Sequence, residues 1–338
     1  MLAKFFETLY HKAFVNIVVE GGQTSIYMEL CSKTKVVEST QATFETDKVN
    51  SELIEFINSY IRETPYFYIS VLDMAKDQGV IPTCEKNRLS YYYDLSSSEH
   101  KCSDKKWTYY TSKPEIYEIE KVYKEIGVDF IFSPFTLLSN FFKDKISSTL
   151  AMYIILQRGY ISIAIFDSSE LLYGDHLDME HDASEDILIS DDLDDDIELD
   201  LEDGIDLEDI DVDSDDMELI DDFGDIEDLD SIEEIDEFSE HKDVEEEFYE
   251  TEEVIAESDE DSFNEDYQRF SLIQSSIGRY YKDIKYKSSF IENVYIGDGV
   301  GVSSDMKRYL EEEMFLNVYI RHLNLAEEVC ELAKMEFN

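Results

Sequence analysis

The sequence predicts a two-lobed α/β protein that is interrupted by one long acidic segment. Strand-like and helix-like segments follow one another in the order β-β-β-α-β in the first half, and the same order recurs in the second half. The acidic residues gather at one place, between the third strand and the helix of the second repeat. A duplicated unit of this kind is typical of two packed α/β lobes with a cleft between them.

The first repeat has clear boundaries. Asp47 is placed to cap a helix with one apolar face, and Pro65 ends that helix. Residues 75–106 are polar and predict a loop-rich excursion. The strands expected around these features are Val15–Val19, Ser25–Leu30, Val36–Phe44, Tyr66–Leu72, Trp107–Thr111 and Val128–Phe132. A helix from Ser112 to Gly127 is expected before the last of them.

The second repeat begins with the most apolar run of the chain, Thr149–Phe166. Gln157-Arg158-Gly159 lies at its centre, so a pair of strands with a tight turn is expected and a membrane span is not. The remaining expected elements are a strand at Glu170–Gly174, a helix at Asp266–Ile284, a strand at Ile291–Ile296, a helix from Ser303, a strand at Phe315–Ile320 and a helix at Leu325–Met335. We expect a first lobe at 1–146, and a second lobe at 147–174 plus 267–338.

Residues 175–266 form the acidic insertion. They hold 47 acidic residues and one basic residue, Lys242, so they carry −46 of the formal charge of −53. Repulsion between carboxylates and the shortage of aromatic side chains predict a disordered segment. Apolar residues alternate with the acids from Ile197 to Ile210, as in segments that dock on a partner or on their own domain. A solubilising insertion and an interaction segment therefore both remain open.

Charge and residue spacing exclude several function classes. A chain this acidic is expected to bind neither nucleic acid nor an anionic membrane. The acidic run lacks the spacing of a calcium-binding loop, because Leu199 and Leu201 would fall at ligand positions. No CxxC pair and no zinc-like spacing is present, so we expect no metal site and free thiols in a reducing cytoplasm. The cysteines are Cys31, Cys84, Cys102 and Cys330.

Three stretches carry a resemblance to a known superfamily. They are the opening hairpin Val15–Leu30, the middle section Ser112–Phe142 with Thr149–Gly174, and the closing section Ile291–Ile320, which contains the run Gly297-Asp298-Gly299-Val300-Gly301. Their order resembles the actin-like (ribonuclease H-like, ASKHA) ATPases. Within that superfamily, the chain is most similar to the PilM proteins of type IV pilus assembly and to the cytoplasmic domain of the GspL proteins of type II secretion.

The resemblance implies a nucleotide site made of three loops. The positions that match those loops are Glu20, Gly21, Gly22, Gln157, Gly159, Gly297, Gly299 and Gly301. The aspartates that hold hydrated Mg²⁺ in the family are replaced by Val19 and Ile155, which cannot bind it. The acidic insertion also takes the place of the family's nucleotide-closing subdomain. We therefore expect a degenerate member with no catalytic residue and with no cofactor, or ATP bound weakly. The glycine loop is equally consistent with packing alone.

The resemblance further implies a function. A PilM-like protein is a cytoplasmic scaffold that binds a short peptide of a PilN-like single-span inner-membrane protein and couples a motor ATPase to the membrane platform. The platform could serve a pilus, a secretion system or DNA uptake. This chain would attach to the membrane only through that partner and would not insert. Two alternatives remain: an active Mg-dependent ATPase that uses Glu20, and an acidic insertion that acts as a nucleic-acid mimic or a lure for a basic partner.

Overall fold

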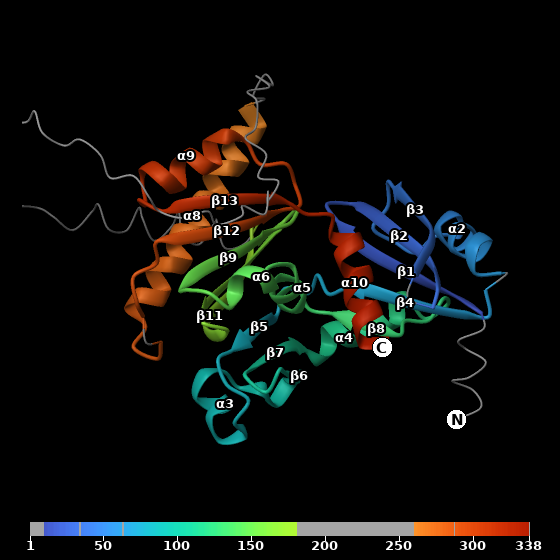
Figure 1. Cartoon of the computed structure of the whole chain (residues 1–338), viewed down its shortest axis with the longest axis horizontal. Helices are drawn as coiled ribbons and strands as arrows, with labels where there is room; N and C mark the ends of the chain where they lie inside the picture. Colours follow the sequence, from blue (N-terminus) through green and yellow to red (C-terminus); the bar gives the residue numbers. More distant parts are fainter. Residues whose placement is uncertain (1–9, 34, 63, 181–259, 287, 338) are drawn as a thin grey trace, which may run out of the picture. The chain divides into compact units, whose positions relative to one another are not determined.

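The computed structural model describes residues 10–33, 35–62, 64–180, 260–286 and 288–337 (Figure 1). Most of the acidic insertion, including the docking predicted for Ile197–Ile210, lies outside these residues. At its two ends the prediction of disorder was wrong, because residues 175–178 belong to a strand and residues 260–266 to a helix. The strands of the described part form two five-stranded sheets and one three-stranded sheet.

The first five-stranded sheet has the order β3-β2-β1-β4-β8. Its first three strands form an antiparallel meander, and the last two run parallel to β1. Alternating apolar residues of β1 and β4 face helix α2 (Ser51–Ile61), whose Leu53 and Ile57 are buried against them. Asn50 starts this helix by accepting a hydrogen bond from the Leu53 N–H. The strands are β1 (His11–Glu20), β2 (Gln23–Ser32), β3 (Lys35–Phe44), β4 (Tyr66–Leu72) and β8 (Phe130–Phe132).

The second five-stranded sheet has the order β11-β10-β9-β12-β13, which repeats that of the first. Here too a three-strand antiparallel meander is extended by two parallel strands. Helices α8 (Glu260–Lys282) and α9 (Ser304–Glu312) cover one face (Figure 1). The strands are β9 (Ala151–Leu156), β10 (Tyr160–Asp167), β11 (Glu170–Asp178), β12 (Asn293–Asp298) and β13 (Asn317–His322). The duplicated sheet order confirms the expected α/β fold with a repeated unit.

A core cluster joins the helices that lie against the other faces of the two sheets. Helix α10 (Leu325–Phe337) packs on β1, β2 and β4, while α5 (Pro134–Phe141) packs on β9 and β10 and touches α10. A short helix, α6 (Lys143–Ile146), follows α5 and leads to β9. Fully buried Tyr153 and Ile155 of β9 belong to this cluster. None of the described helices has the length and apolar character needed to cross a membrane.

Residues 75–106 are more ordered than the sequence suggested. They contain β5 (Gln78–Ile81), α3 (Lys86–Tyr92), a 3₁₀ turn η1 (Leu95–Ser97) and β6 (Ser98–Ser103). With β7 (Trp107–Ser112) these strands form a sheet of order β5-β7-β6, and α4 (Lys113–Val122) follows. The loop-rich prediction was wrong because β5 and β6 are only four and six residues long, too short to give a clear sequence period, and are held in place by pairing with β7.

Two cysteine expectations need correction. Cys84 and Cys102 are joined by a disulfide, with Cα atoms 5.6 Å apart, so the prediction of four free thiols was wrong for this pair. Spacing alone did not indicate it, because 18 residues and a three-stranded sheet separate the two positions. Cys31 and Cys330 are free and buried, as expected.

Candidate functional site

The two hairpin turns predicted to face nucleotide phosphates are tight glycine turns. Gly21 and Gly22 have φ of 53° and 79° between β1 and β2. Gly159 has φ of 86° in the turn between β9 and β10. These left-handed conformations suit glycine, so the sequence explains both turns without a ligand.

The two turns are in direct contact. The Glu20 carboxylate accepts a hydrogen bond from the Arg158 backbone N–H at 3.0 Å. The Arg158 guanidinium donates to the Gln23 side-chain oxygen at 2.7 Å. The Arg158 side chain also lies on Gly21, where a Cβ would approach its Cδ to 3.2 Å. We call Glu20, Gln23 and Arg158 the hairpin clasp.

The environment of the clasp changes the chemistry of Glu20. Burial raises the pKa of its carboxyl to about 7, although the hydrogen bond and charge of Arg158 act in the opposite direction. Glu20 is therefore divided between its neutral and ionised forms at neutral pH. A carboxylate already engaged by the protein backbone is a poor candidate for activating water.

The positions of the two missing aspartates are apolar and packed. Ile155 is fully buried in the core cluster that includes α5 and α10, and Val19 packs against the core under α2. Gln157, at a predicted glycine position, is also fully buried. Its side-chain nitrogen lies 3.3 Å from the Met74 sulfur, and its side-chain oxygen has no partner among the described residues.

The predicted adenosine loop is held by its own backbone. The Asp298 carboxylate accepts three N–H bonds, from Val300 (3.0 Å), Gly301 (2.8 Å) and Val302 (3.0 Å). A Cβ at Gly299 would lie 2.8 Å from the Leu156 carbonyl oxygen, to which the Gly299 N–H donates. A Cβ at Gly297 would meet Phe141 at 3.2 Å. Close packing within the protein therefore accounts for Gly297 and Gly299.

The three predicted loops converge on residues 156–159. The first hairpin reaches them through the clasp, and the glycine loop reaches them through Gly299 and Leu156. The structure thus brings Glu20, Gly21 and Gly299 close to residues 156–159. The contacts in this region are made by the protein's own side chains and backbone.

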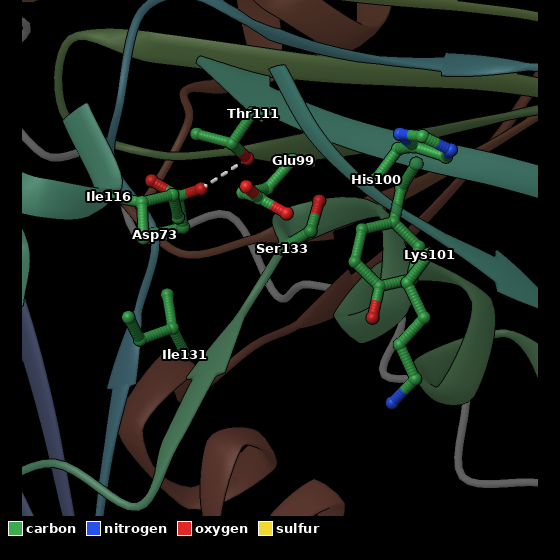
Figure 2. A pocket seen from close by; sticks show the side chains of 9 residues that line it. Asp73, Glu99, His100, Lys101, Thr111, Ile116, Ile131 and Ser133 are labelled. Atoms are coloured by element: carbon green, nitrogen blue, oxygen red, sulfur yellow. Dashed lines mark hydrogen bonds between the residues drawn. The ribbon is translucent and has the colours of Figure 1, made fainter. Parts of the chain in front are cut away.

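A second site was not predicted from the sequence. A cavity of about 140 Å³ opens between the end of β4, the end of β8 and the strands β6 and β7. Figure 2 shows the side chains of Asp73, Glu99, Thr111 and Ser133 around it, with the apolar side chains of Ile116 and Ile131 beside them. His100, Lys101 and Tyr109 complete the lining. We call this cavity the Asp73 pocket.

Asp73 is the deepest charged group of the pocket. Its side chain is 1% exposed, accepts a hydrogen bond from the Thr111 hydroxyl at 2.6 Å and accepts another from the Ala75 N–H. Burial raises the pKa of its carboxyl to about 6, and the nearby Glu115 carboxylate acts in the same direction. Asp73 has no ion pair among the described residues, so its charge at neutral pH is balanced by hydrogen bonds alone.

The rim of the pocket carries the opposite charge. Lys101 pairs with Glu336 of α10 at 2.9 Å, and both side chains are largely exposed. In Figure 2 its ammonium lies away from Asp73. The pocket thus has an acidic floor, a polar wall and apolar sides, and it suits a cationic group on an apolar stem.

The sequence contained a signal for this pocket. Asp73 directly follows the apolar strand β4, and ligands often bind beyond the carboxyl ends of parallel strands. The other acid, Glu99, lies in the stretch read as a loop, so its strand and its position could not be inferred. Among the described residues no group of three His, Cys, Asp or Glu side chains is arranged to hold a metal ion.

Two family models match the chain, and both are described as domains of unknown function. DUF8341 matches residues 152–338, and DUF8569 matches residues 10–139. No curated protein matches the sequence.

Several solved structures are similar. A PilM-PilN type IV pilus biogenesis complex is 8% identical, covers 94% of each chain and has a TM-score of 0.46. An actin-like protein of unknown function from Bacteroides thetaiotaomicron is 14% identical over 56% of this chain and 79% of its own, with a TM-score of 0.36. Component A of (R)-2-hydroxyglutaryl-CoA dehydratase from Acidaminococcus fermentans is 8% identical over 95% of each chain, with a TM-score of 0.36.

Likenesses of this size say nothing of the activity of this chain. The first family model covers more than half of the sequence and all of the second five-stranded sheet except Ala151. The chain therefore belongs to the family described as domain of unknown function DUF8341.

Proposed function

We propose that this protein is a non-hydrolysing actin-like scaffold that binds a cytoplasmic peptide of a PilN-like inner-membrane protein. The observation that carries the first half of the proposal is the hairpin clasp. Arg158 and Glu20 occupy the space between the two turns that hold phosphates in active relatives. The partner class follows from the resemblance to PilM proteins, and it includes a motor ATPase coupled through the same platform.

The hairpin clasp and the aliphatic residues Val19 and Ile155 both oppose the binding of Mg·ATP. Phosphates would have to displace Arg158 from Gly21 and Gln23, and Mg²⁺ would find no carboxylate at Val19 or Ile155. A protein that has lost the metal-holding groups retains the fold as a binding surface. The protein would then be cytoplasmic and peripheral to the inner membrane, held there by its partner.

The Asp73 pocket supports the second half of the proposal. A buried carboxylate that has no ion pair among the described residues is stabilised when a cation enters and pairs with it. Ile116 and Ile131 line the same cavity and would contact the apolar stem of a lysine or arginine side chain. A basic residue of a short peptide is the occupant that this chemistry favours.

Nucleotide binding is tested by calorimetry with Mg·ATP and by phosphate release. We expect binding weaker than about 1 mM and no turnover. Glu20→Ala and the control Glu45→Ala should be indistinguishable from wild type. Glu45 follows β3, and its exposed carboxylate accepts a hydrogen bond from the Gln23 side chain. Micromolar binding with turnover that Glu20→Ala abolishes would establish the active ATPase instead.

Peptide binding is tested with the cytoplasmic amino-terminal peptide of a single-span membrane protein encoded beside this chain. Asp73→Asn removes the charge but keeps the size, and we expect it to weaken binding roughly 30-fold. Because the carboxyl has a pKa of about 6, wild-type affinity should also fall as the pH drops below 6. Asp94→Asn is the matched control, since Asp94 caps η1 outside the pocket. Equal binding by Asp73→Asn and wild type would remove the pocket from the proposal.

A further inference from the structure

The wall of the Asp73 pocket is the edge strand of a small sheet. Three consecutive residues of β6, Glu99, His100 and Lys101, line the cavity. β6 pairs with β7 along one side only, because the sheet order is β5-β7-β6. β6 is an edge strand of only six residues, so its position depends strongly on contacts other than its pairing with β7.

The Cys84–Cys102 disulfide is the covalent tie of this strand. Cys102 lies next to Lys101 on β6 and pairs with Thr108 of the central strand β7. Cys84 lies just after β5, whose last residue, Ile81, pairs with the same Thr108 from the other side. The bridge therefore spans the central strand and fixes β6 to the segment that follows β5. Lys101 of β6 also forms an exposed ion pair with Glu336 of α10, and exposed ion pairs contribute little.

The disulfide can be reached from solvent, and the other cysteines cannot. Cys102 is exposed and Cys84 is half-buried. Cys31 and Cys330 are 2% and 0% exposed. Burial raises the pKa of the Cys31 thiol to about 11 and also raises the pKa of the Cys330 thiol. Thiol chemistry in this molecule is therefore directed to the pair at the pocket wall.

We propose that the Cys84–Cys102 disulfide is a redox switch for the Asp73 pocket, holding β6 in the peptide-binding position when oxidised and releasing it when reduced. A dithiol reductant supplies two electrons and two protons. The Sγ–Sγ bond breaks, both cysteines become thiols, and the reductant closes its own disulfide. The Cys84 sulfur lies 3.1 Å from the Trp107 carbonyl oxygen, which can accept its new hydrogen bond, so Cys102 with β6 is the side set free.

This inference rests on the proposed peptide binding, and its test separates the two. The full chain is equilibrated with dithiothreitol or with its oxidised form. Affinity for the same amino-terminal peptide and hydrogen exchange of the β6 amides are then measured on each sample. We expect reduction to weaken binding about tenfold and to speed exchange in β6 by a similar factor, while β1 and β9 stay unchanged. The carboxyl pKa of Asp73, followed by NMR, should fall as water enters the pocket.

Two double variants complete the design. Cys84→Ser with Cys102→Ser should behave as the reduced protein under both conditions, and Cys31→Ser with Cys330→Ser should keep the full redox response. Equal affinity and equal β6 exchange in oxidised and reduced wild type would overturn the switch. If no sample binds the peptide but reduction still speeds β6 exchange, the switch stands and the proposed partner is wrong. The wild-type titration decides the question even where a variant fails to fold.

Discussion

His176 of β11 illustrates how one side chain can couple two sheets to pH. Its Nδ1 atom lies 3.0 Å from the Ser162 hydroxyl, and its ring stacks on Tyr160 at 5.1 Å. On the other side Gln78 of the small sheet approaches its Nε2. Burial lowers the pKa of the imidazole to about 4, although Asp175 and Asp178 act in the opposite direction. At neutral pH the folded protein therefore holds a neutral ring.

This lowered pKa predicts loss of stability on mild acidification. Between pH 6.5 and pH 4 the unfolded chain binds a proton at this position and the folded chain does not. The contribution of His176 to the free energy of unfolding should therefore fall by about 1–2 kcal/mol between pH 7.5 and pH 5. Glu20 and Asp73, whose pKa values are raised, act in the opposite direction, so the contribution is measured by urea denaturation as the difference between wild type and His176→Asn.

His176→Asn keeps an acceptor for Ser162 and should remove most of that pH dependence. His322→Asn, at the exposed end of β13, is the control, because water surrounds that side chain before and after unfolding. The same pH dependence in His176→Asn and in wild type would assign the effect to other groups.

At the scale of elements, glycines decide where backbones can approach. Gly299 follows β12 and donates its N–H to the Leu156 carbonyl of β9, so a side chain there would collide with fixed backbone. Gly278 lies inside α8, where an added Cβ meets nothing within 4 Å. The same substitution is therefore expected to have opposite effects in the two places.

Gly299→Ala should lower the free energy of unfolding by about 2 kcal/mol, because the Cβ would sit 2.8 Å from a carbonyl oxygen. Gly278→Ala should raise it by about 0.5–1 kcal/mol through the helix propensity of alanine. Both values are measured by urea unfolding at one pH. If Gly299→Ala proved neutral, the loop would be mobile and its glycines would again be candidates for ligand contact.

Helices and strands with a clear hydrophobic period in the sequence were predictable. Short strands that depend on pairing with a neighbouring strand were not. The two meanders and helix α10 follow from long β-rich runs and a 3.6-residue pattern in the sequence. β5 and β6 were not predicted, because they are only four and six residues long and are held in place by pairing with β7 and by the disulfide. The Asp73 pocket was not predicted for the same reason, since Glu99, one of its lining residues, lies on β6. The contact between the two hairpin turns was not predicted either, because it depends on the Arg158 side chain and on Glu20.

At the scale of the whole molecule, charge and fold are separate properties. Residues 181–259 hold 40 of the 81 acidic residues and one of the 28 basic residues. The two features on which the proposed function rests, the hairpin clasp and the Asp73 pocket, belong to the remaining residues. If the scaffold proposal is right, the acidic residues tune solubility and long-range attraction without taking part in peptide recognition.

Replacing residues 181–259 with a flexible linker tests that separation. The Gln268 side chain of α8 donates to the Met179 carbonyl at 2.6 Å, and Glu260 lies eight residues, or about 12 Å, along the helix from it. Ten Gly/Ser residues, with a mean span of roughly 17 Å, can bridge this distance. We expect unchanged peptide affinity at 150 mM salt and unchanged urea denaturation. Capture of a basic partner that disappears with the segment and weakens steeply with salt would instead make the acidic residues the functional element.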